Sequence, residues 1–484
     1  MLLTLPEINL YPLLPALIPA VTAMLVMLAD VLLPGKNKSW LALLALVGLA
    51  AASYFTVMLF GANLSAFNAS IVADNFALGI ALVILGAGAA TILLSLDYLR
   101  ARQLDLGEYL ALLLGAVSGM ILMALANDLI VIFLGLELFS LPLYVLSAFW
   151  RTNDRSLEAG MKYFLLGSFS SAFFLYGIAL LYGATDATNL TKISAAANEP
   201  TVASNPMFLM GAALLIVGFG FKVGLAPFQW WIPDVYEGAP TPITAFMSVA
   251  TKAAAFAAFF RAFMVAFPSA VVDWQFVLAL LAVVSMTVGN VAALTQTNLK
   301  RMLAYSSIAN AGYILIALVV GGQAGLSAAL FYLAAYTVMN LGAFGGLIAM
   351  GQGDQERLTL DELAGAAQTK PWAAAAMAIS LLSLAGFPPF AGFVAKFFVF
   401  GAAVNAGYVW LAVIGVLNSL VSVYYYLHPI VKMYMNPPAE GWAQAPARAP
   451  IFLAVAVIVA VLLTIAMGLF PGGMLNFAQA AMVK

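Results

Sequence analysis

The chain contains 484 residues, of which 64% are hydrophobic and only 8% charged, with a formal net charge of −1. Soluble globular proteins carry about 25% charged residues, so the composition excludes soluble enzymes, nucleic-acid-binding proteins and disordered proteins. Cysteine is absent and His428 is the only histidine, which excludes cysteine-ligated iron–sulfur clusters and bis-histidine haem within this chain, and we expect no cofactor in it.

Apolar stretches recur from one end of the chain to the other. A membrane-spanning helix needs about 20 predominantly apolar residues. The sequence predicts fourteen such helices, near residues 10–33, 40–60, 75–99, 108–126, 129–149, 157–182, 206–232, 240–267, 274–295, 301–320, 325–350, 372–401, 405–435 and 450–470. The longest polar connections, near 183–205 and 351–371, are too short to be separate domains. We therefore expect one all-α polytopic membrane domain.

Basic residues are distributed unevenly between the two sides of the predicted membrane domain. The loops at the ends of odd-numbered helices contain Lys36, Lys38, Arg100, Arg102, Arg151, Arg155, Lys300, Arg301, Arg357, Lys370 and Arg448. The other side has only Lys192, Lys484 and Arg261. Cytoplasmic loops are enriched in lysine and arginine. We therefore expect the loops at the ends of odd-numbered helices to lie in the cytoplasm and both termini to lie on the opposite side of the membrane.

Five ionisable residues are predicted within the membrane: Glu137, Lys162, Lys222, Lys252 and Lys396. A charge at the bilayer centre costs about 2.5–3.5 kcal/mol, so such residues commonly have a function. Lys162 lies close to a helix end, and snorkelling to the interface is an equal alternative for it. Glu137, Lys222 and Lys252 lie deeper, and a static buried ion pair is the structural alternative for them.

The residue types of this set favour proton chemistry. Burial disfavours the protonated form of a lysine, whereas a nearby carboxylate favours it. A lysine whose carboxylate partner approaches or recedes is therefore a proton site of adjustable affinity, and Glu137 is the natural partner. Hard metal ions need oxygen ligands. Four of these five residues are lysines, which have no oxygen ligand to offer, so the set suits protons better than metal ions.

Two predicted helices contain the same interruption, G-x-x-P-F, at 224–228 and 386–390. Proline removes a backbone donor and breaks a helix. Paired broken helices are typical of transporters with inverted repeats, although kinks that serve only packing are the alternative. If helices 4–8 and 9–13 are two five-helix repeats, each break lies in the fourth helix, and the odd number gives the repeats opposite topology. The expected organisation is helices 1–3 (1–106), a first repeat (107–267), a second, inverted repeat (268–435) and helix 14 (436–484).

Aromatic residues cluster near several predicted helix ends. Tyr424, Tyr425, Tyr426 and His428 are predicted to form an interfacial belt rather than a proton relay. Trp230 and Trp231 are predicted to be interface anchors for the same reason.

Several motifs resemble a known family. They are PDVYEGAPTP at 233–242, LEL at 136–138 with LPL at 141–143, and TQTNLKR at 295–301 followed by YSSI at 305–308. Together they resemble subunit N of the proton-pumping NADH–quinone oxidoreductase, respiratory complex I, over essentially the whole chain. The related subunit M has glutamate where this chain has Lys396, and subunit L is longer, so both differences favour N.

The resemblance implies a proton-translocating function and a role for each buried charge. Glu137 and Lys222 would form a pair, Lys252 would link two half-channels, and Lys396 would lie near the exit. NAD, FMN, iron–sulfur clusters and quinone would be bound by partner subunits, with subunits K and M as neighbours. The fourteen helices differ from the shorter animal mitochondrial counterpart and suggest a bacterial or plastid-type chain. We expect a bacterial inner-membrane protein, in which the distribution of basic residues places both termini on the periplasmic side. An Mrp-type cation/proton antiporter subunit and a structural membrane anchor are the alternatives.

Overall fold

The computed structural model describes residues 9–33, 38–267, 274–351, 355–439 and 450–481. Within these residues, thirteen helical spans are long and apolar enough to cross a membrane, which confirms the all-α polytopic fold. They are η1 with α1 (Tyr11–Leu13 and Leu14–Leu32), α2 (Ser39–Met58), α3 (Asn75–Ala101), α4 (Leu106–Leu125), α5 (Leu129–Ser147), α6 (Asp154–Thr185), α9 (Pro206–Val223), α11 (Thr241–Val265), α12 (Trp274–Ala293), α13 (Leu299–Val320), α14 (Gly322–Met350), α18 (Val409–Met435) and α19 (Ile451–Leu469).

The two predicted helices with breaks differ from simple spans. The twelfth predicted helix is two shorter apolar helices, α16 (Pro371–Ala385) and α17 (Ala391–Asn405). The seventh ends at Val223, and a separate short helix, α10 (Trp231–Gly238), follows the break. The remaining short helices are α7 (Leu190–Ala197), α8 (Pro200–Ala203), α15 (Ala366–Thr369) and α20 (Gly472–Gln479).

A small antiparallel hairpin, which the sequence did not predict, connects α2 to α3. Its strands are β1 (Leu64–Ala66) and β2 (Ile71–Ala73), paired from Leu64 with Ala73 to Ala66 with Ile71. Each strand has three residues, which is too short for an alternating pattern to be recognised.

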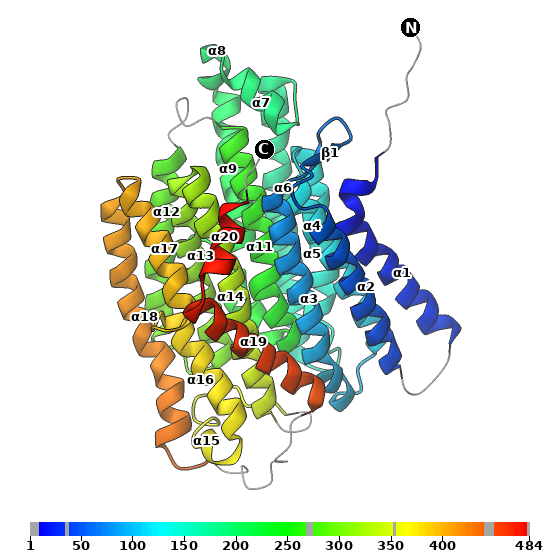
Figure 1. The fold of residues 1–484 in the computed structure, drawn as a ribbon, viewed down its shortest axis with the longest axis vertical. Coiled ribbons are helices and arrows are strands. Elements are labelled where there is room, and N and C mark those ends of the chain that lie inside the picture. The colour runs from blue at the N-terminus through cyan, green and yellow to red at the C-terminus, as the bar shows by residue number, and fades with distance from the viewer. Residues whose placement is uncertain (1–8, 34–37, 268–273, 352–354, 440–449, 482–484) are drawn as a thin grey trace.

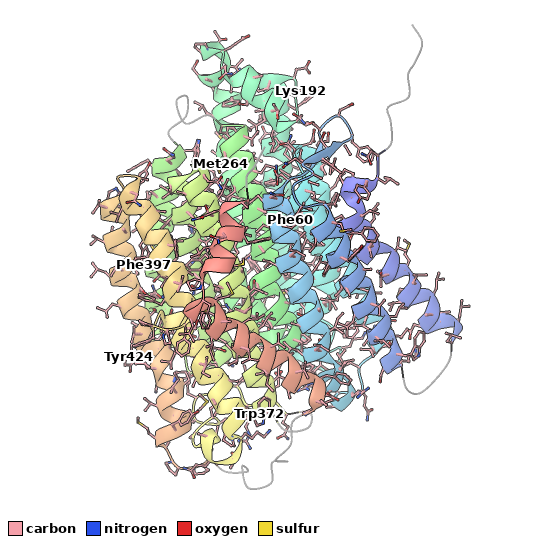
Figure 2. All side chains as sticks on the ribbon, viewed as in Figure 1. Phe60, Lys192, Met264, Trp372, Phe397 and Tyr424 are labelled. Atoms are coloured by element: carbon pink, nitrogen blue, oxygen red, sulfur yellow. The ribbon has the colours of Figure 1, made fainter. Side chains whose placement is uncertain are left out.

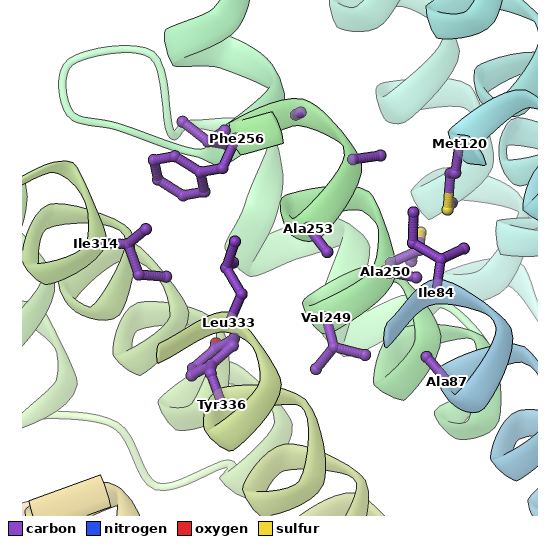
Figure 3. Packing of buried hydrophobic residues seen from close by; sticks show 14 of the residues in the cluster. Ile84, Ala87, Met120, Val249, Ala250, Ala253, Phe256, Ile314, Leu333 and Tyr336 are labelled. Atoms are coloured by element: carbon purple, nitrogen blue, oxygen red, sulfur yellow. The ribbon is translucent and has the colours of Figure 1, made fainter. Parts of the chain in front are cut away.

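α11 occupies the centre of the helix assembly and is the most completely buried span (Figure 1). Figure 3 shows Val249, Ala250 and Ala253 of α11 lying between Ile84 of α3 on one side and Leu333 of α14 on the other. Small residues let neighbouring helix backbones approach closely, which is how membrane helices gain packing energy. α19 crosses obliquely over α3 and α14, and α20 follows it (Figure 1).

The loops rich in basic residues gather at one end of the molecule. The junctions α3–α4 and α14–α15 lie at the lower end in Figure 1, opposite α7 and α8. Arg151, between α5 and α6, pairs with Glu108 at the start of α4, which places that junction at the same end. Lys192 lies at the other end (Figure 2). Lys36, Arg448 and Lys484 lie outside the described residues.

Candidate proton-transfer site

The first break is a helix C-terminus stabilised by glycine. α9 ends at Val223, and Gly224 has a φ of 78°, a left-handed conformation that costs little only for glycine. The amide of Leu225 then donates to the carbonyl oxygen of Gly220 at 2.8 Å, as in a Schellman motif. Pro227 follows and cannot continue the helix. The break therefore exposes the carbonyl oxygens of the last turn of α9 to donors outside the helix, such as the indole nitrogen of Trp231, which donates to the carbonyl oxygen of Phe221.

The second break has the same local geometry. α16 ends at Ala385, Gly386 has a φ of 93°, and the amide of Phe387 donates to the carbonyl oxygen of Leu382 at 3.1 Å. Two prolines, at 388 and 389, follow. The shared G-x-x-P-F motif thus gives one structure at two places far apart in the chain.

Lys222 lies in the last turn of α9 and is 3% exposed. Its Nζ donates a 2.7 Å hydrogen bond to Oγ of Ser140 on α5. The ring centroids of Phe139, Tyr144 and Tyr163 lie 5.4, 5.8 and 5.9 Å from this nitrogen. Aromatic faces attract a cation, so these rings stabilise the charged lysine without a carboxylate in contact.

Glu137 is half-buried on α5 and accepts a 2.5 Å hydrogen bond from Oγ of Ser171 on α6. Within the described residues, Glu137 and Lys222 form no direct ion pair. The connection runs along α5, because Ser140, which binds Lys222, lies three residues after Glu137 on the same helix face. Glu137 and Lys222, which the family resemblance implies to be a pair, are therefore linked through Ser140 rather than by direct contact.

Lys252 lies on α11, is 1% exposed and bridges two other helices. Its Nζ donates to the carbonyl oxygen of Val223, the last residue of α9, at 2.9 Å. It also donates to the carbonyl oxygen of Ser307 on α13, at 2.5 Å. Lys252 thus connects the first broken helix to α13.

Lys396 lies on α17, just after the second break, and is 6% exposed. Its Nζ donates to the carbonyl oxygens of Leu384 and Ala385, both at 3.0 Å, and to Oγ of Ser419 at 2.8 Å. A cavity of about 340 Å³ adjoins it, lined by Ala385, Gly386, Phe387, Phe393, Phe397, Phe400, Val416, Ser419, Leu420 and Val423. Phe397 lies on the outer face of the molecule in Figure 2, so this cavity connects the lysine with the perimeter.

Each broken helix therefore ends against a lysine ammonium group. Lys252 binds the end of α9, and Lys396 binds the end of α16. The C-terminus of a helix carries partial negative charge from unpaired carbonyl groups, so a cation is stabilised there. This arrangement holds a buried lysine nitrogen with helix carbonyls instead of a carboxylate.

Lys162 is different from the other three lysines because its side chain is 40% exposed. It pairs with Asp234 and with Glu158, both at 2.7 Å, and Arg301 also contacts Asp234 at 2.7 Å. Burial raises the pKa of the Asp234 carboxyl group, but Lys162 and Arg301 hold it below its ordinary value. These ion pairs line a cleft of about 230 Å³ at the end of the molecule with the basic loops.

The prediction of interfacial aromatic residues is wrong for three of the six. Tyr425, Tyr426 and Trp231 are buried, His428 is half-buried, Tyr424 is 63% exposed and Trp230 is also exposed. Successive residues on an α-helix point about 100° apart, so neighbours in sequence face different surroundings. Tyr424 lies on the perimeter in Figure 2 and fits a membrane-facing position.

A buried ion pair that the sequence did not reveal joins α3 to α11. The guanidinium of Arg261 donates to both carboxylate oxygens of Asp74, at 2.8 and 2.9 Å, and neither side chain is exposed. Asp74 also caps the start of α3 by accepting from the amide of Ala77. The partners lie 187 residues apart, so no local pattern could pair them.

Lys300 was assigned to a loop but is buried. Its Nζ donates to the carbonyl oxygen of Ala239 at 2.6 Å and lies 3.9 Å from the carboxylate of Glu356, which also accepts from Thr241. Burial raises the pKa of Glu356, but Lys300 and Thr241 outweigh this effect and hold it below the ordinary value. This cluster ties α11, α13 and the loop before α15 together.

The sequence and the fold are similar to those of known protein families and solved structures. Residues 126–422 match the family described as NADH:quinone oxidoreductase/Mrp antiporter, TM. A chain of respiratory complex I from Thermus thermophilus with bound aureothin superposes with a TM-score of 0.82 at 36% identity, covering 97% of this chain and 100% of that chain. A chain of the Mrp complex from Dietzia sp. DQ12-45-1b has the same fold, with a TM-score of 0.84 at 21% identity, covering 98% of this chain and 97% of that chain. The fold is therefore that of an antiporter-like membrane protein.

Two full-length relatives narrow the assignment. NADH-quinone oxidoreductase subunit N of Trichlorobacter lovleyi is 47% identical over 474 residues, which covers 98% of this chain and 97% of the relative. The subunit N of Chloroflexus aggregans is 43% identical over 485 residues, covering 99% of each. The chain belongs to the NADH-quinone oxidoreductase subunit N family, as its motifs indicated.

Proposed function

We propose that the chain is a proton-translocating membrane subunit of an NADH–quinone oxidoreductase. The observation that carries this proposal is the row of three buried lysines, Lys222, Lys252 and Lys396, each located at a broken helix or bound to its end. A buried lysine exchanges a proton readily because burial disfavours its charged form. NAD, FMN, iron–sulfur clusters and quinone would be bound by partner subunits, whose electron transfer shifts the surroundings of these lysines.

The roles follow from the order of the side chains. Glu137 and Lys222 load the proton, Lys252 passes it from α9 to the α13 side, and Lys396 is the last buried proton site before the water on the far side. Lys162, with its ion pairs at the basic end, belongs to the entrance. The contacts of Lys252 with both α9 and α13 support its central position in this path.

The path would run through two inverted repeats, residues 107–267 and 268–435, flanked by 1–106 and 436–484. Two similarities support this division. α4 packs on α5 as α12 packs on α13, and the two breaks have the same backbone geometry. The basic end would face the cytoplasm of a bacterial cell, with both termini on the periplasmic side of the inner membrane. Subunits K and M and membrane lipids would surround the chain.

An Mrp-type cation/proton antiporter subunit is the second candidate, since the fold also matches an Mrp chain. A static membrane anchor is the third. Native purification separates them: the complex I subunit co-migrates with flavin- and iron–sulfur-containing partners in a band with NADH dehydrogenase activity. Co-migration with other antiporter subunits and no such activity would favour the Mrp alternative. An inactive assembly that is unaffected by neutralising the lysines would favour the anchor.

A further inference from the structure

A buried cluster of hydroxyl and amide groups lies between α13, α14 and α18. Oη of Tyr426 lies 2.5 Å from Oγ of Ser306. Nδ2 of Asn310 donates to the carbonyl oxygen of Ser306 at 2.9 Å, and Oη of Tyr332 donates to Oδ1 of Asn310 at 2.7 Å. All four side chains are buried, so the cluster is shielded from the membrane lipids.

A second cluster lies beside the first, between α12, α13 and α18. Oη of Tyr425 donates to Oδ1 of Asn290 at 2.9 Å, and Nδ2 of Asn290 donates to Oη of Tyr313 at 3.1 Å. Asn290 also donates to the carbonyl oxygen of Asn418 at 3.1 Å. The amide of Asn290 therefore fixes the orientation of two tyrosine hydroxyl groups.

The two clusters lie between Lys252 and Lys396. Ser306 is the neighbour of Ser307, whose carbonyl oxygen accepts from Lys252. The rings of Tyr425 and Tyr426 join the two clusters, with centroids 4.5 Å apart. At the far end, the Tyr313 ring centroid lies 5.1 Å from Nζ of Lys396.

Among the described residues that form these clusters there is no carboxylate or histidine, which sets this region apart from the α5–α6 region with Glu137. A hydroxyl group can accept one proton and release its own, whereas an amide mainly holds its partners in fixed orientations. The hydroxyl groups of the two clusters can therefore pass a proton on without any of them carrying a lasting charge.

We propose that the hydroxyl groups of Ser306, Tyr426, Tyr425 and Tyr313 form the proton bridge from Lys252 to Lys396, with Asn290 and Asn310 as positioning residues. The proposal rests on the proposed proton-translocating function and adds the groups that carry the internal step. Protonated Lys252 gives up one proton, each hydroxyl accepts a proton and passes on its own, and neutral Lys396 takes up the last. Only O–H and N–H bonds change. Water molecules complete the path at the two ends and between Tyr425 and Tyr313, where the Asn290 amide orients the two hydroxyl groups but does not pass the proton.

The test uses the assembled complex reconstituted in vesicles, with proton uptake driven by NADH oxidation. Tyr426→Phe removes one hydroxyl and keeps the ring, and Ser306→Ala removes its partner with little change of volume. Tyr424→Phe is the matched control, because Tyr424 is the adjacent residue and faces outward. General acid–base groups commonly contribute about 10²-fold or more to proton-transfer rates, so we expect at least about tenfold slower proton uptake in the two variants.

A second readout separates proton transfer from packing. If the hydroxyl chain carries the proton, the solvent deuterium isotope effect on uptake rises in Tyr426→Phe and Ser306→Ala, while Tyr424→Phe keeps the wild-type value. Assembled Tyr426→Phe or Ser306→Ala complexes with wild-type uptake and isotope effect would overturn the bridge. Slow uptake with an unchanged isotope effect would reduce these residues to packing and also overturn it. Failure of the wild-type complex to take up protons would instead reject the proposed function.

Discussion

The ammonium group of Lys252 lies 2.9 Å from the carbonyl oxygen of Val223, the residue at which the first broken helix ends. A protonated lysine carries a positive charge, which the partial negative charge of the helix end attracts, whereas the neutral amine does not. Loss of the proton therefore weakens the attachment of α9 to α11 and α13. The protonation state of Lys252 and the position of the helix end are coupled through this contact.

The first prediction tests whether Lys252 must release its proton. Arginine stays protonated with a pKa above about 12. We expect Lys252→Arg to slow NADH-driven proton uptake at least about tenfold, nearly as much as Lys252→Ala. Lys192→Arg, at an exposed position in α7, is the control and keeps normal uptake. A fully assembled Lys252→Arg complex that pumps normally would reduce Lys252 to a structural charge.

The second prediction concerns Glu137 and Lys222, which approach each other through Ser140 without forming an ion pair. Because each charge alters the protonation of the other, Glu137→Gln and Lys222→Met should each impair pumping. The double mutant should deviate from additivity by at least about 0.5 kcal/mol. The rates are measured in a double-mutant cycle on assembled complexes, with Glu199→Gln on the exposed surface as the control. Strict additivity would show that the two charges are independent.

The third prediction concerns Lys396. If this residue is the last buried proton site before the water on the far side, a titratable side chain is needed there rather than a permanent positive charge. Lys396→Glu should retain more proton uptake than Lys396→Ala, and Lys396→Arg should be poor. Uptake is compared with the quinone-reductase rate and with a native gel that reports assembly. Full pumping in Lys396→Arg, or no advantage of glutamate over alanine, would indicate a static counter-charge.

The fourth prediction uses the lowered pKa of Glu356 in the cluster with Lys300 and Thr241. A carboxyl group with a lowered folded-state pKa stabilises the protein above its unfolded pKa, and this contribution disappears as the pH falls through the folded value. Glu356→Gln should therefore destabilise the protein by about 1–3 kcal/mol at neutral pH. The difference from wild type should shrink toward zero at acidic pH. Thermal unfolding of the purified complex over a pH series measures this difference in stability. A difference that does not change with pH would contradict the stabilising role of the ionised Glu356 carboxylate.

The fifth prediction fixes the orientation in the membrane. The chain contains no cysteine, so single introduced cysteines report their own positions. Thr152→Cys lies at the basic end, and Ser204→Cys lies between α8 and α9 at the opposite end; both positions are exposed. An impermeant thiol reagent applied to intact cells should label Ser204→Cys and should reach Thr152→Cys only after the membrane is opened. The reverse pattern would overturn the predicted orientation.

Much of the fold could be predicted because a membrane imposes strong local requirements. A span must be long and apolar, and Gly224 and Gly386, each followed by proline, mark breaks that need no distant partner to form. For the same reason Lys222, Lys252 and Lys396 were recognisable as buried charges. The motifs at 233–242 and 295–301 resembled the family to which the chain belongs.

The contacts of those charges were decided only by the tertiary structure. The family resemblance implied that Glu137 and Lys222 form a pair, and only the structure shows that Ser140, on the same face of α5, is the residue that contacts Lys222. The burial of Tyr425 next to exposed Tyr424 depends on how α18 is rotated against α12 and α13, which a sequence of apolar and aromatic residues does not encode locally.

The sequence by itself therefore determined which segments span the membrane, where two helices break and which side chains bring charge into the interior, because each follows from residues close together in the chain. The tertiary structure decided what satisfies those charges. Lys252 meets a carbonyl 29 residues earlier and another 55 residues later, and Arg261 meets Asp74 across 187 residues. A buried donor must find an acceptor wherever the packed helices provide one, and that choice depends on the packing of all the helices together.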